Sequence, residues 1–123
     1  MHAVRRNLQN KIEKLLKIFP VVVILGVRQS GKTTLSKQCC SNWTYFDLEN
    51  GSDFDRITGD LDFFFRQYPE KIIIDEAQRS EALFRHLRGV IDKNREMKGR
   101  FLLTGSSSFS LLRTISESLA GRI

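Results

Sequence analysis

Residues 26–34, GVRQSGKTT, carry backbone and side-chain groups suited to holding an anion. Gly26 and Gly31 let the backbone turn its N–H groups toward a phosphate, and Lys32 adds a charge that reaches the outer phosphates. Thr33 offers a hydroxyl to Mg²⁺ at the start of a helix, whose positive end adds further N–H donors. The remaining candidate ligands are Gln29, Ser30 and Thr34. The segment predicts a phosphate-binding loop, and a Gly-rich turn without a ligand is the alternative.

A second candidate segment is KIIIDE at residues 71–76, where an apolar run ends in two acids. At the end of a strand, the Asp75 carboxylate is expected to meet a Mg²⁺ ion held on the phosphates. Glu76 is expected to activate the attacking water as general base. Aliphatic runs that end in acids also occur by chance, and the pairing with the loop some forty residues earlier makes this one specific.

The third candidate segment is TGSSS at residues 104–108, which follows the apolar residues 101–103. A small hydroxyl at this point can touch the γ-phosphate or the attacking water. The alternative is a Ser-rich turn that caps the next helix. The residues alone leave both readings open.

Apolar runs and helical patterns alternate along the chain, as expected of an α/β fold. The run at 21–25 is β-branched, which is typical of a strand buried on both faces of a parallel sheet, and we expect further strands at 44–48, 72–75 and 101–104. Helical spacing of apolar residues predicts helices over 4–19, from 32 to about 41, over 52–67, from 80 to 93 and after 109.

Details of these helices are also predicted. Ser52 and Asp55 form a candidate capping box, and Ser80 is a candidate N-cap. Gly59 interrupts the helical pattern over 52–67, so this segment is expected to form either one helix or two short ones. Residues 63–65, three phenylalanines, are expected to rest on the sheet, with a base-stacking platform as the alternative. The basic helix at 4–19 is expected to pack on the domain rather than on a membrane surface.

The composition sets broad limits. A length of 123 residues fits one domain, which we divide into an N-terminal helix and lead-in at 1–20 and a core at 21–123. No apolar run approaches the roughly 20 residues that span a bilayer, so we expect a cytoplasmic protein without membrane contact. The net charge of +6 leaves nucleic acid open as a partner, but its segregation into helical segments favours solvated helix faces. Adjacent Cys39 and Cys40 predict reduced thiols.

Taken together, residues 26–34, 72–78 and 103–107 resemble the AAA-type ATP-binding domain of a bacterial and archaeal ATPase group. Loops of that group read Gly-Pro-Arg-Gln-x-Gly-Lys-Thr-Thr, and its acidic strand ends Asp-Glu-x-Gln. Its Leu-Thr-Gly-Ser strand end is followed by Leu-Ala-Gly-Arg, here residues 119–122. The resemblance implies a P-loop NTPase three-layer fold with a mainly parallel sheet of about four strands. It also implies that the strand ending at Thr104 lies between the loop strand and the strand ending at Asp75.

The same resemblance assigns further roles. Ser106, or as second choice Thr104, is similar to the sensor position, and Arg122 is similar to a basic residue that acts on phosphate within the chain or across a subunit interface. Arg113 is a weaker candidate for that role. Val27 replaces the usual proline. Family members continue into a fifth strand and a C-terminal domain. We therefore expect a truncated core whose loop strand lies at a sheet edge. A C-terminal domain or another protein is the expected partner, and an oligomer is allowed.

The sequence therefore predicts an ATPase that binds ATP and Mg²⁺ and uses Lys32, Thr33, Asp75 and Glu76 to drive a partner domain. A nucleotide-binding or interaction module without turnover is the first alternative. A helicase-like nucleic-acid motor is the second, although such motors need two such domains. A small-molecule kinase is disfavoured because the short chain shows no acceptor-binding insertion.

Overall fold

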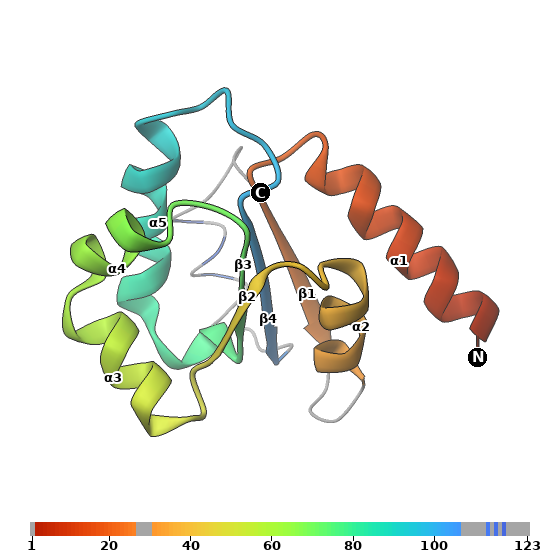
Figure 1. Cartoon of the computed structure of the whole chain (residues 1–123), viewed down its shortest axis with the longest axis horizontal. Helices are drawn as coiled ribbons and strands as arrows, with labels where there is room; N and C mark the ends of the chain where they lie inside the picture. Colours follow the sequence, from red (N-terminus) through yellow and green to blue (C-terminus); the bar gives the residue numbers. More distant parts are fainter. Residues whose placement is uncertain (1, 27–30, 107–112, 114, 116, 118–123) are drawn as a thin grey trace.

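The computed structural model describes residues 2–26, 31–106, 113, 115 and 117. Helices and strands alternate along these residues (Figure 1). In chain order they are α1 (His2–Leu16), β1 (Val21–Gly26), α2 (Lys32–Cys39), β2 (Thr44–Asp47), α3 (Gly51–Gly59), α4 (Leu61–Gln67), β3 (Ile72–Asp75), the 3₁₀ helix η1 (Ala77–Arg79), α5 (Glu81–Asp92) and β4 (Phe101–Ser106).

The strands form one parallel sheet in the order β1-β4-β3-β2. β4 therefore lies between the loop strand β1 and the acidic strand β3, as the resemblance implied. Among the described strands, β1 lies at one edge of the sheet and β2 at the other. The α/β fold with a four-stranded parallel sheet is thus confirmed.

The sheet separates two apolar layers, because successive side chains of a strand point to opposite faces. Helices α3, α4 and α5 cover one face, and α1 and α2 cover the other (Figure 1). In β3, Ile72 and Ile74 contact the first layer, whereas Ile73 contacts the second together with Ile12 and Leu16 of α1. α1 therefore packs on the sheet through Ile12 and Leu16, whereas Leu8 on the same helix is exposed.

Local sequence signals placed some helix ends correctly, although α1, expected to run to residue 19, ends at Leu16. The Ser80 hydroxyl accepts a hydrogen bond from the Leu83 N–H and caps α5. The chain divides at Gly59 and Asp60 into α3 and α4, so two short helices form. The predicted Ser52 capping box is wrong: the N-cap of α3 lies two residues earlier, at Asn50, whose side chain accepts the cap hydrogen bond from the Asp53 N–H. Asn is as good an N-cap as Ser, so the pattern did not distinguish them.

The three phenylalanines of α4 have different environments. Phe64 and Phe65 are buried, and the Phe64 ring packs edge to face against Phe46 at 5.0 Å. Phe63 is 51% exposed. The expectation that this run rests on the sheet is confirmed for the two buried rings, which have no face free for a nucleic-acid base.

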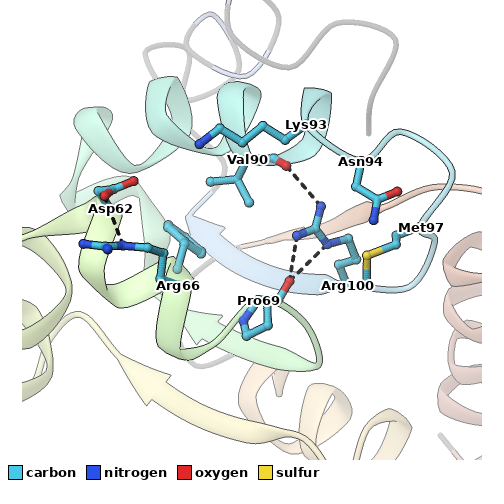
Figure 2. Close-up of a pocket in the computed structure, with 9 residues that line it drawn as sticks. Asp62, Arg66, Pro69, Val90, Lys93, Asn94, Met97 and Arg100 are labelled. Carbon is cyan, nitrogen blue, oxygen red and sulfur yellow. Dashed lines mark hydrogen bonds and ion pairs between the residues drawn. The ribbon is translucent and has the colours of Figure 1, made fainter.

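A buried arginine joins the elements at the amino edge of the sheet. The Arg100 guanidinium donates two hydrogen bonds to the Pro69 carbonyl, at 2.8 and 3.0 Å, and one to the Val90 carbonyl at 3.2 Å (Figure 2). A cavity of about 290 Å³ lies beside it, between the C-terminal parts of α4 and α5. Arg100, directly before β4, thus connects that strand to α5 and to the segment that follows α4, away from the carboxyl edge where the candidate site lies.

No helix among the described residues is both long and apolar enough to cross a bilayer. Cys39 and Cys40 are free cysteines, the first half-buried and the second buried. The prediction of free, packed thiols is confirmed. The predicted helix after residue 109 falls mostly on residues outside the described part of the chain.

Candidate functional site

The carboxyl edge of the sheet brings the three candidate segments together. Gly26 at the end of β1 is in register with Ser106 at the end of β4. Ile74 pairs with Leu103, so Asp75 and Thr104 follow at the same level of neighbouring strands. Because the strands are parallel, segments far apart in sequence meet at one edge. The start of α2, which follows the loop, lies against the same edge.

Asp75 accepts hydrogen bonds from three hydroxyl groups. Its Oδ2 atom accepts from Thr33 Oγ1 and from the Tyr45 hydroxyl, each at 2.5 Å. Its Oδ1 atom accepts from Thr104 Oγ1. The side chains come from α2, β2 and β4, and Asp75 itself is only 3% exposed. Three elements therefore fix the orientation of one carboxylate.

These contacts set the charge of the site. Burial alone would raise the pKa of Asp75, but the hydrogen bonds from Thr104, Thr33 and Tyr45 outweigh it and lower the pKa below its usual value. Burial raises the pKa of the Tyr45 hydroxyl, and its hydrogen bond to Asp75 raises it further. Asp75 is thus an anion at neutral pH, and Tyr45 stays a protonated donor.

Glu76 is held through both its backbone and its side chain. Its φ of 55° is left-handed, a strained conformation for a residue with a Cβ, and its N–H donates to Thr104 Oγ1 at 3.2 Å. Its Oε2 atom accepts a hydrogen bond from Gln78 Nε2 at 2.6 Å. The side chain is buried to 9% exposure next to Asp75. Such strain persists only where the surroundings over-determine the conformation.

The two proposed sensor residues differ in their contacts. Thr104 is fully buried and uses its hydroxyl between Asp75 and the Glu76 backbone. Ser106 is half-buried at the strand end, where its N–H donates to Gln78 Oε1 at 3.3 Å and its hydroxyl accepts from Gln78 Nε2 at 3.4 Å.

The described part of the loop has the expected backbone. Gly31 has a φ of 87°, which favours glycine, and precedes α2 without a side-chain cap. Lys32 begins α2, Thr33 is half-buried and Thr34 is exposed. The other predicted site residues, Gln29, Ser30 and Arg122, lie outside the described residues. The weaker candidate Arg113 is 71% exposed and pairs with Glu117 at 3.2 Å.

The donor set at this edge fits a magnesium ion held together with phosphates. Thr33 and Asp75 supply a hydroxyl and a carboxylate oxygen within 2.5 Å of each other. Mg²⁺ prefers oxygen ligands and is usually held by one or two protein groups, with phosphates and water completing its shell. The described residues hold no cluster of three or more His, Cys, Asp or Glu side chains suited to a metal. The hydroxyl and the carboxylate therefore fit Mg²⁺ held together with a nucleotide.

Sequence reasoning missed the roles of two residues in this network. Tyr45 was placed on a strand but not in the site, although its place two residues before the end of β2, on the same face as Asp75, is a usable signal. Gln78 was noted only as part of the Asp-Glu-x-Gln run. Its bridge to Ser106 depends on the strand order and has no local signal.

Comparison with known proteins agrees with this geometry. The chain is 40% identical over 122 residues to an uncharacterized protein of Mycobacterium tuberculosis and, equally, to one of Mycobacterium bovis. The match covers 97% of this chain but 27% of each relative, so the chain spans about a quarter of their length. No solved structure matches it significantly. The family model for the AAA domain matches residues 19–123, and the chain therefore belongs to the AAA domain family of nucleotide-binding P-loop proteins.

Proposed function

We propose that this chain binds ATP with Mg²⁺ and hydrolyses it. The observation that carries the proposal is the contact between the Thr33 hydroxyl and the Asp75 carboxylate at the head of α2, with Glu76 directly beside it. A threonine that follows a phosphate loop and an acid that ends another strand of the same sheet are the pair that P-loop NTPases use to hold Mg²⁺.

Nucleotide binding is assigned to the loop. In this assignment, backbone N–H groups of the segment from Gly26 to Gly31, with Gln29 and Ser30, would bind the phosphates, and Lys32 would neutralise the outer ones. Thr33 and Asp75 hold the ion, and Thr34 continues the helix start. The N-cap of α2 is consistent with this assignment, because Gly31 offers the first turn no side-chain acceptor. An ion held there by Thr33 and Asp75 would supply positive charge that neutralises the phosphates.

Hydrolysis is assigned to Glu76 as general base. Glu76 accepts a proton from water as the water oxygen bonds to the γ-phosphorus. The bond from that phosphorus to the β–γ bridging oxygen breaks, and ADP leaves with that oxygen. Lys32 and Arg122 stabilise the negative charge, and Ser106 contacts the γ-phosphate or the water. Ser106 suits this role better than Thr104, whose hydroxyl is engaged with Asp75 and the Glu76 backbone.

Turnover is proposed to drive a partner domain. The relatives are almost four times as long as the match, so a further domain of the same protein or another protein is the proposed recipient of the motion. We assign residues 1–20 to the same folded unit as the core at 21–123, because Ile12 and Leu16 of α1 share an apolar cluster with Leu102 of β4.

The test measures phosphate release and nucleotide affinity for the wild-type chain, Glu76→Gln and Lys32→Ala. We expect Mg²⁺-dependent release by the wild type, a loss of about a hundredfold or more in kcat for Glu76→Gln with ATP affinity kept, and weak binding for Lys32→Ala. If the wild type and Glu76→Gln both release no phosphate but keep their affinity for ATP, the hydrolysis proposal is wrong. The chain would then be a nucleotide-binding module without turnover. Stimulation by single-stranded nucleic acid in a salt-dependent manner would support the motor alternative.

A further inference from the structure

Gln78 bridges the ends of two neighbouring strands. One amide group reaches the Glu76 carboxylate after β3, at 2.6 Å, and both the N–H and the hydroxyl of Ser106 at the end of β4, at 3.3 and 3.4 Å. Gln78 sits in the short helix η1, directly after the strained backbone of Glu76. The sequence-based assignment gave Gln78 no role in the site.

The surrounding groups allow only one orientation of this amide. Its nitrogen must face Glu76, because a carboxylate only accepts hydrogen bonds, and its oxygen must face Ser106, whose backbone N–H only donates. The reversed amide would place two acceptors together at Glu76 and two donors together at Ser106. The Ser106 backbone therefore fixes which end of Gln78 meets Glu76.

This bridge leaves Glu76 with little freedom. Its backbone N–H is held by Thr104, and its Oε2 atom is held by Gln78. Among the described residues, no donor holds the other carboxylate oxygen, Oε1, which is left to accept a proton from water. We infer that Gln78 is a positioning residue for the general base, and that it makes the orientation of Glu76 depend on Ser106 at the end of β4. The inference rests on the proposed hydrolysis by Glu76.

The test compares two near-isosteric substitutions of Gln78 with a neighbouring control. Gln78→Met keeps the length of the side chain but removes both hydrogen-bonding ends, and Gln78→Glu replaces the donor to Glu76 by a like charge. Arg79→Met is the control, because Arg79 points instead to Glu49 at the surface, at 3.3 Å. We expect Gln78→Met to lower kcat about tenfold to a hundredfold with KM changed by less than about threefold, and Gln78→Glu to lower kcat further. The control should keep wild-type kcat.

A double mutant separates positioning from a general loss of structure. If Gln78 acts through Glu76, then adding Gln78→Met to Glu76→Gln should cost no further rate in single-turnover assays. An added loss as large as in the wild-type background would overturn the inference, as would unchanged kcat in both Gln78 variants. Absence of phosphate release by the wild-type chain would overturn the proposed function and, with it, the inference.

NMR of the nucleotide-free chain tests the bridge without turnover. The side-chain amide resonances of Gln78 should shift in Glu76→Gln and also in Ser106→Ala. Resonances that respond to neither substitution would overturn the bridge even if the wild-type chain hydrolyses ATP. Failure of the Gln78 bridge is thereby distinguished from failure of the proposed hydrolysis.

Discussion

The Tyr45 hydroxyl donates a hydrogen bond to Asp75 Oδ2 at 2.5 Å, across the pairing of β2 with β3. The ring also lies under Lys37 Nζ, 4.1 Å from its centroid, so the aromatic side chain is fixed between α2 and the sheet. Groups that orient a metal-binding carboxylate affect the metal although they do not touch it.

Tyr45→Phe should therefore weaken magnesium-dependent nucleotide binding. The Mg²⁺ concentration needed for binding should rise about tenfold. The cause is the loss of one of the three donors that orient Asp75 and lower its pKa. Titrations of a fluorescent ATP analogue at several Mg²⁺ concentrations measure it. The matched control is Tyr68→Phe, in the aromatic cluster on the other layer. Equal Mg²⁺ dependence in wild type and Tyr45→Phe would contradict the prediction.

The adjacent thiols should react slowly in the folded chain. Burial, with the nearby charge of Glu13, raises the pKa of Cys39 to about 11, and burial with Cys39 and Glu13 raises that of Cys40 to about 12. Because the thiolate is the reactive form, a disulfide reagent at pH 8 should label both cysteines far more slowly in the native protein than in denaturant. Labelling at the unfolded rate in native buffer would show that the pair is not packed as described.

The same shifts predict the alkaline limit of stability. The folded chain keeps both thiol protons above pH 9.0, the value for an unperturbed cysteine, whereas the unfolded chain releases them. Their contribution to the free energy of unfolding is complete below about pH 9 and is lost as the pH rises toward 11 to 12. Denaturant titrations of the wild type and Cys39→Ala/Cys40→Ala between pH 8 and 11 measure it, and the double variant should lose less stability over that range.

Arg100→Met should destabilise the fold. Methionine keeps most of the buried stem but removes the donors to the Pro69 and Val90 carbonyls, which then lack those partners. The expected loss is about 2 to 3 kcal/mol, measured by denaturant unfolding. Arg66→Met, at the other end of the same cavity (Figure 2), is the control, because its pair with Asp62 is largely exposed and contributes about 0.5 kcal/mol or less. Equal losses in both variants would remove the structural role assigned to Arg100.

The phenylalanine run offers a matched pair of truncations. Phe64→Ala should cost about 3 to 5 kcal/mol, since Phe64 is 1% exposed and contacts the rings of Phe46, Phe65 and Tyr68. Phe63→Ala should cost less than about 1 kcal/mol, because that side chain is 51% exposed. A large loss of stability for Phe63→Ala would contradict its exposed position, and weaker nucleic-acid binding without loss of stability would support a stacking platform instead.

Much of the fold could be predicted because it depends on local patterns. The β-branched run after Pro20 indicated β1, and the helical spacing from Leu83 to Ile91 indicated α5, since one face of each must be buried in any compact fold. Helix ends were less certain where two good caps compete, as Asn50 and Ser52 do. The roles proposed for Gln29, Ser30 and Arg122 remain predictions, because these residues lie outside the described part of the chain.

By itself the sequence determined which residues could perform the chemistry: the glycine-rich loop with Lys32 and Thr33, and the acids Asp75 and Glu76 at the end of an apolar strand. Residue type and local spacing are sufficient for that, because phosphate and metal chemistry demand particular groups. Only the tertiary structure decided which other side chains contact and orient these residues. The order β1-β4-β3-β2 brings Thr104 to Asp75 and Ser106 to Gln78, and β2 adds Tyr45. These contacts join residues about 30 positions apart, so they arise from strand pairing, which no local pattern contains.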